Sequence, residues 1–181
     1  MEKPKMGAEE TTPKGPLDLN YEGDEKDVKK RIEFLYQKAD EAIELIKSTL
    51  LKGGFSKERS RELKDSYDIK EGNSYYSSDW GDLVKAGEIS VRILEQKFAA
   101  AQTEEALEDL YYQLVRSLEE RKKDLKIAIS DIEEGLDLMK NGPNAMAMAG
   151  IQAISEAAGI YEDNLSFLLD FVNQKLAEAK E

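Results

Sequence analysis

The feature that most constrains the fold is a run of apolar residues that recur alternately three and four positions apart over residues 104–139. This spacing places the apolar side chains on one face of an α-helix. Thr103 can cap the helix, and Glu104 and Glu105 then lie in its first turn, where acidic groups interact favourably with the helix dipole. The Asn-Gly-Pro sequence at 141–143 ends it. We predict one amphipathic helix of about 37 residues, roughly 55 Å long.

Three further stretches repeat this helical spacing behind a capping residue. They are residues 24–51 behind Asp24, residues 79–101 behind Asp79, and residues 144–176 behind Asn144. The chain shows neither strand-type alternation with hairpin turns nor an internal repeat. The predicted fold class is therefore all-α: an elongated antiparallel helical bundle of about four long helices with coiled-coil-like packing, plus a short helix within residues 52–81.

The length of the chain, 181 residues, is that of one domain. Residues 1–23 hold three of the four prolines and few apolar side chains. So few apolar groups do not offset the entropy lost on ordering the segment. We expect a flexible N-terminal tether over residues 1–23 and a single helical-bundle domain over residues 24–181.

The absence of histidine and cysteine excludes most classes of enzyme. Disulfide frameworks, zinc fingers, iron–sulfur clusters, thiol nucleophiles and the usual catalytic triad all need one of these residues. Glycine-rich phosphate loops are missing, and adjacent acids such as Glu133 and Glu134 do not face each other on a helix. We expect no enzymatic activity and no cofactor; a metal enzyme built on carboxylates alone is the weak alternative.

The chain has 38 acidic and 26 basic side chains and a formal charge of −12. This charge opposes binding to nucleic acid and to anionic membrane surfaces, and it favours a soluble monomer. No apolar run reaches the roughly 18 residues of a transmembrane helix. Residues 1–5 do not have the character of a signal peptide. We expect either a cytoplasmic protein or the mature part of an exported protein with a lipid anchor further upstream.

Residues 52–81 interrupt the helical pattern and are much longer than an ordinary bundle turn. Their first part predicts a short helix from Ser56 to Asp68 that is basic within an acidic chain. Arg59, Arg61 and Lys64 are its candidate partner-binding cations. The alternative is a solvated helix held by ordinary ion pairs between residues three and four apart.

Tyrosine, serine, glycine, asparagine and the single tryptophan of the chain are concentrated in residues 72–81. This mixture is typical of protein-binding loops, because aromatic rings offer rigid contact area and small polar residues adapt their hydrogen bonds. Tyr75, Tyr76 and Trp80 are therefore the main candidate partner-binding residues, since Tyr and Trp dominate interface hot spots. The alternative is that these rings fold back and cap the end of the bundle.

The layout of the chain resembles the surface lipoproteins of Borrelia-type spirochaetes, especially those of the relapsing-fever group. The residues that carry the resemblance are the tether to Gly23, the helix from Asp24 to Leu51, and the turn at 141–143 into an Ala- and Met-rich helix. The resemblance implies a noncatalytic adhesin on the bacterial outer surface that recruits a host protein such as complement factor H in immune evasion. The alternative is an intracellular helical adaptor or structural protein that associates through helix–helix contacts.

Overall fold

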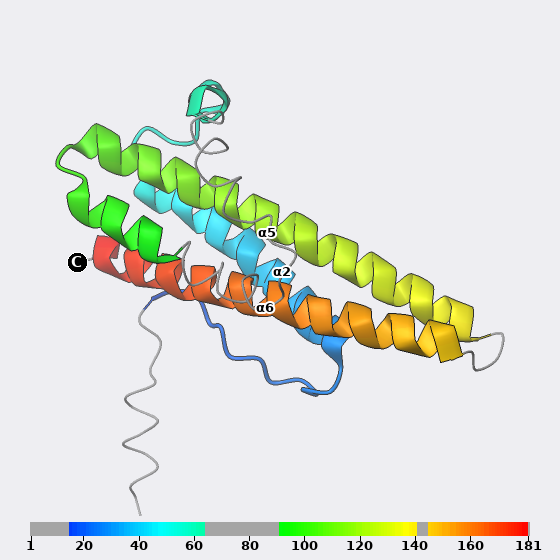
Figure 1. Cartoon of the computed structure of the whole chain (residues 1–181). Helices are drawn as coiled ribbons and strands as arrows, with labels where there is room; N and C mark the ends of the chain where they lie inside the picture. The colour runs from blue at the N-terminus through cyan, green and yellow to red at the C-terminus, as the bar shows by residue number, and fades with distance from the viewer. Residues whose placement is uncertain (1–14, 64–90, 141–144, 181) are drawn as a thin grey trace, which may run out of the picture.

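The structure is a computed structural model that describes residues 15–63, 91–140 and 145–180. All the regular elements among these residues are helices, and no strand occurs in them (Figure 1). The elements are α2 (Val28–Leu45), the π-helix η1 (Ile46–Leu50), α5 (Glu104–Met139) and α6 (Ala145–Lys180), with shorter helical stretches at residues 57–63 and 91–100. The predicted all-α helical bundle is confirmed.

The two longest helices, α5 and α6, form an antiparallel hairpin, and α2 packs against both of them (Figure 1). The helical stretch 91–100 lies beside the C-terminal half of α6. Each fully buried leucine or isoleucine contributes roughly 1.5–3 kcal/mol to stability. The large side chains that are fully buried between the helices include Ile32, Ile46, Leu94, Leu114, Leu118, Leu125, Leu165, Leu169 and Leu176.

The first residues of α5 and α2 show whether the predicted capping residues are correct. Thr103 caps α5 as predicted, because its side-chain oxygen accepts a hydrogen bond from the Ala106 backbone N–H at 3.0 Å. The predicted cap Asp24 is wrong for α2: the helix begins three residues later, and Asp27 accepts from the Lys30 N–H at 3.2 Å. Asp24 instead accepts from the Lys26 N–H in the preceding turn. The predicted caps Asp79 and Asn144 lie outside the described residues.

The first helix ends in a π-helical turn rather than a regular one. The Leu51 backbone N–H donates to the Ile46 carbonyl, five residues earlier, at 3.2 Å. This wider turn leaves both Leu50 and Leu51 buried. The helical path ends directly afterwards, where Gly54 adopts a φ of +80° that a residue with a side chain rarely takes.

The N-terminal segment is packed against the bundle further than its composition predicts. Leu17 is only 1% exposed, and its backbone N–H and carbonyl both bind the side-chain amide of Asn173, at 2.9 and 3.0 Å. Gly15 lies so close to the Asn173 carbonyl that there is no room for a Cβ at this position. Leu17, expected within the flexible tether of residues 1–23, is therefore held on the bundle by Asn173. Residues 1–14 lie outside the described residues.

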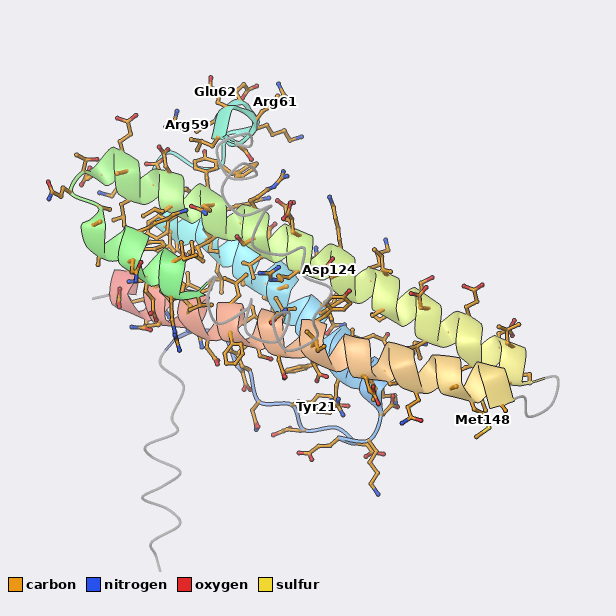
Figure 2. The ribbon with its side chains drawn as sticks, in the orientation of Figure 1. Tyr21, Arg59, Arg61, Glu62, Asp124 and Met148 are labelled. Carbon is orange, nitrogen blue, oxygen red and sulfur yellow. The ribbon has the colours of Figure 1, made fainter. Side chains whose placement is uncertain are left out.

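One end of the α5–α6 hairpin extends past the N-terminus of α2 (Figure 1). The ion pair between Lys29 and Glu133, at 3.1 Å, marks where α2 begins to cover α5. Beyond that point Leu136 and Met148, both expected on the buried stripes, are exposed, and Met148 lies near the end of the hairpin (Figure 2). Leu138 is also 61% exposed. The stripes are correct as helix faces, but the described residues provide no third helix to cover them at this end.

Candidate functional site

The sequence-predicted loop residues Tyr75, Tyr76 and Trp80 lie outside the described residues, and so does the candidate cation Lys64. Arg59 and Arg61 are described, on the helical stretch 57–63 above α5 (Figure 2). The structure therefore locates two of the six predicted partner-binding residues.

Arg59 holds its own helix onto the bundle. Its guanidinium binds both oxygens of Asp109 on α5, with Nη2 at 2.6 and 2.8 Å and Nε at 3.1 Å. Glu62 and Glu105 lie within 4 Å of the same group. The hydrogen bonds that Arg59 donates to Asp109 raise the pKa of Arg59. Arg59 was expected to contact a partner; the structure shows that its guanidinium binds Asp109 on α5, and contact with a partner stays a prediction.

The stretch that carries Arg59 begins where the short helix was predicted to begin, and the predicted end at Asp68 lies outside the described residues. Ser56 caps it, since its hydroxyl accepts from the Arg59 backbone N–H at 3.1 Å. Phe55 packs against Tyr112 of α5, with ring centroids 5.5 Å apart. Arg61 is exposed, and it has no ion-pair partner among the described residues. Of the two predicted cations that the structure describes, Arg61 is the more exposed.

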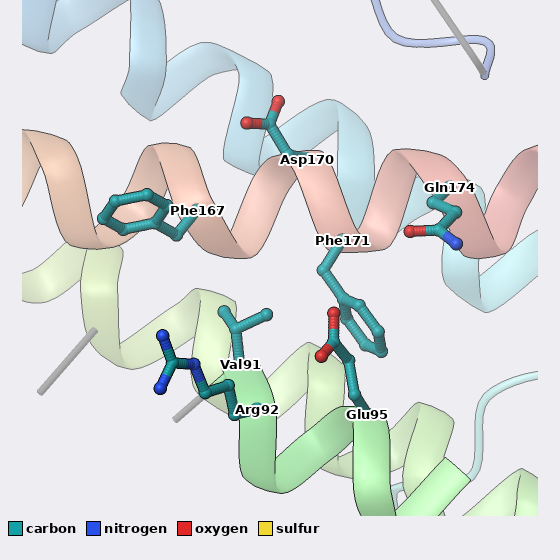
Figure 3. Close-up of a pocket in the computed structure, with 7 residues that line it drawn as sticks. All are labelled: Val91, Arg92, Glu95, Phe167, Asp170, Phe171 and Gln174. Atoms are coloured by element: carbon teal, nitrogen blue, oxygen red, sulfur yellow. The ribbon is translucent and has the colours of Figure 1, made fainter. Parts of the chain in front are cut away.

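A groove that the sequence did not predict lies between the stretch 91–100 and α6 (Figure 3). It is an open hollow of about 350 Å³. One wall comes from the stretch 91–100 and the other from a single face of α6. The α6 residues that line the groove are three, four or seven positions apart, and residues at these spacings share a helix face. The lining residues are Val91, Arg92, Glu95, Phe167, Asp170, Phe171 and Gln174.

The floor of the groove is aromatic. Phe171 is 4% exposed and meets Phe98 edge to face, with centroids 5.5 Å apart. Lys175 lies over both rings, at 5.0 and 5.4 Å from their centroids, and its ammonium group binds Glu178 at 3.1 Å. Phe167, one turn earlier on α6, is 37% exposed. The groove therefore combines a fixed aromatic floor with one aromatic ring that is open to contact.

The charges at the groove edges are mostly acidic. Asp170 and Glu95 have no hydrogen-bond or ion-pair partner among the described residues. Partial burial raises the pKa of Asp170. Figure 3 shows the two carboxylates at different edges, with the Glu95 side chain reaching toward α6 beside Phe171. Arg92 points away from Glu95 and takes part in an interaction of its own.

A second hollow, of about 750 Å³, lies between the N-terminal segment and α6. Its charges bind each other. Arg31 donates from Nε and Nη2 to the two oxygens of Glu162, both at 2.9 Å, and Nη1 donates to the Glu25 carbonyl. The hydrogen bond to Glu162 raises the pKa of Arg31. Because Arg31 of the chain itself already binds Glu162 in this hollow, the groove at Phe167 is the better candidate for a partner.

One feature of the sequence could have indicated the groove. Phe167 and Phe171 lie off the predicted apolar stripe of α6, which runs through Leu165, Leu168 and Val172. Two aromatic residues four apart, next to the stripe and with Asp170 between them, indicate a second contact face on the helix. The sequence analysis made no prediction for that face, because its contact with residues 91–98 comes from a distant segment.

Metal sites and membrane-spanning helices are two further features that could indicate a function. The described residues contain no group of three or more acidic side chains placed to hold a metal ion. None of the helices in the described ranges is long and apolar enough to cross a membrane. Comparison of the chain with known protein families, with curated proteins and with solved structures finds no match in any of the three.

Proposed function

We propose that the chain is a noncatalytic protein-binding module and that the groove at Phe167 is its contact surface. The observation that carries this proposal is the exposed ring of Phe167 beside a buried aromatic floor. An aromatic side chain that is partly exposed on a rigid helix is the kind of group that dominates interface energies. Acidic groups at the edges provide orientation and partner choice, as polar rims do in protein interfaces.

The proposed setting is the bacterial outer surface, with a host protein such as complement factor H as the partner and immune evasion as the role. This part of the proposal rests on the resemblance of the layout to spirochaetal surface lipoproteins. The DNA sequence upstream of Met1 tests it. An export signal with a lipidated cysteine supports surface display, and an upstream sequence with neither overturns it.

The binding test uses Phe167→Ala. The immobilised chain is exposed to serum, captured proteins are identified, and the affinity of purified factor H is measured by surface plasmon resonance. If Phe167 is a hot spot, its truncation weakens binding by about 2 kcal/mol or more, roughly 30-fold in Kd. Ile127→Ala on α5 is the matched control, because Ile127 is a 60% exposed apolar side chain away from the groove.

Two results would overturn the binding proposal. One is folded wild-type protein, checked by circular dichroism, that captures nothing from serum. The other is a Phe167→Ala variant that binds as tightly as the Ile127→Ala control.

The loop residues Tyr75, Tyr76 and Trp80 remain proposed contacts on sequence grounds. Trp80→Ala tests them in the same assay. A loss of about 2 kcal/mol or more supports a hot spot. Unchanged affinity with a lowered melting temperature would show instead that the ring stabilises the bundle.

A helical adaptor is the second candidate function. The observation that favours it is the exposed apolar group at the end of the α5–α6 hairpin, which includes Leu136, Leu138 and Met148. An adaptor that pairs through this end self-associates as its concentration rises, and Leu138→Lys prevents the association. Sedimentation velocity over a hundredfold concentration range measures this, and a monomer throughout excludes pairing between copies.

A further inference from the structure

We propose that the groove at Phe167 binds a segment of the partner protein in which an apolar side chain is flanked by two basic side chains. The apolar side chain packs on Phe167 and Val91, and the basic side chains meet the carboxylates of Asp170 and Glu95. The inference rests on the proposed function and specifies the chemistry of the partner.

The positions of the two carboxylates set the spacing of the partner's charges. Asp170 comes from α6 and Glu95 from the stretch 91–100, and they lie at different edges of the groove (Figure 3). One cation placed between them would lose contact with the aromatic ring. Two cations on either side of an apolar residue meet both carboxylates and still place that residue on Phe167.

The neighbouring cations of the protein do not already fill these positions. Lys175 is bound to Glu178 and lies over Phe98 and Phe171, so its charge is held at the floor. Arg92 turns away from Glu95 in Figure 3. Asp170 is left partly desolvated with no cation among the described residues to offset that cost, and burial is the cause that raises its pKa. An incoming guanidinium would stabilise the charged form.

The second hollow shows the same chemistry with the cation supplied by the chain itself. There Arg31 binds both oxygens of Glu162 at 2.9 Å, beside the ring of Tyr21 at the mouth. Both hollows present an acid on α6 near an aromatic side chain. One contains an arginine of the protein, and we infer that the other receives its basic group from the partner.

Arginine fits these positions better than lysine. Its planar guanidinium binds a carboxylate through two parallel hydrogen bonds and also stacks on an aromatic ring. The probe is therefore the peptide acetyl-Arg-Ala-Leu-Ala-Arg-amide, compared with the same peptide in which citrulline replaces both arginines. Citrulline keeps the shape and removes the charge.

Binding of both peptides to the full chain is followed by ¹⁵N NMR, which reports weak affinities. We expect saturable shifts at residues 91–95 and 167–174, and affinity about tenfold higher for the arginine peptide. Asp170→Asn and Glu95→Gln each lower the affinity for the arginine peptide about two- to fivefold, the range of a partly exposed ion pair. Asp131→Asn on α5 makes the same change of charge away from the groove and leaves affinity unchanged.

Equal affinity for the two peptides would overturn the inference, and so would an effect of Asp131→Asn as large as that of Asp170→Asn. These outcomes differ from failure of the proposed function. If Phe167→Ala abolishes capture of the partner while both peptides bind equally, the groove is a protein site that does not select basic segments. If the partner binds Phe167→Ala normally, the groove is not the protein site at all.

Discussion

Replacing Asn173 with alanine is the sharpest test of how the N-terminal segment is held. The Asn173 amide makes two buried hydrogen bonds to the backbone of Leu17, at 2.9 and 3.0 Å, and the side chain is 6% exposed. At about 1 kcal/mol each, the two bonds account for roughly 2 kcal/mol. If the segment stays in place, the Leu17 N–H and carbonyl also lose their partners, at about 1–3 kcal/mol for each group.

The loss of stability in Asn173→Ala cannot exceed the cost of releasing the N-terminal segment from the bundle. Once the segment is free, the Leu17 backbone binds water, and the further loss is the burial of one leucine side chain, roughly 1.5–3 kcal/mol. The variant follows whichever route costs less, so we expect Asn173→Ala to lower the free energy of unfolding by about 3.5–5 kcal/mol, the sum of the two bonds and the leucine burial. For a chain of this size that corresponds to a fall of about 7–20 °C in Tm.

Urea denaturation measures the loss, and hydrogen exchange shows where it occurs. Because both residues act through the same anchor, Leu17→Ala combined with Asn173→Ala should be little worse than the more harmful single change. Gln174→Ala, the exposed neighbour of Asn173, is the control. A loss below about 0.5 kcal/mol for Asn173→Ala, or strict additivity in the double variant, would refute the anchor.

Two further predictions concern charged groups. Arg59→Gln should speed hydrogen exchange in residues 57–63, because the bonds to Asp109 hold that stretch on α5. Arg61→Gln is the control and should leave the exchange rates unchanged. Equal exchange in the two variants would show that Arg59 does not hold the stretch on α5. Burial raises the pKa of Asp124, against a smaller lowering effect of Arg121. The folded state therefore binds the proton of Asp124 more readily than the unfolded state does. The pKa of this group is about 3.9 in the unfolded chain and higher in the folded protein. Its contribution to the free energy of unfolding therefore falls as the pH rises from the unfolded pKa through the folded pKa. Urea denaturation of Asp124→Asn at pH 3 to 7 should show less loss of stability with rising pH than wild type, and an identical pH dependence would contradict the burial of this carboxyl.

The features predictable from sequence are those that depend on neighbours within one or two turns. The cap at Thr103 and the stop at Gly54 depend on local backbone geometry, and both agree with the structure. The start of α2 was predicted three residues too early, because the turn before Val28 makes Asp27 and not Asp24 the capping residue.

The features that were not predictable depend on contacts between distant segments. Leu17 has no periodic apolar neighbours, and its burial depends on Asn173, 156 positions later. The role of Arg59 depends on Asp109, 50 positions later. The groove exists because residues 91–98 pack beside one face of α6, and the amino-acid composition does not indicate which helices become neighbours.

Hydrogen–deuterium exchange of the full chain, measured with and without purified factor H or another protein captured from serum, shows whether the groove at Phe167 binds protein. We expect binding to slow exchange at residues 91–95 and 167–174. Slowed exchange confined to the hairpin end at residues 136–138, or no change in the groove upon binding, would rule out the groove as the contact surface.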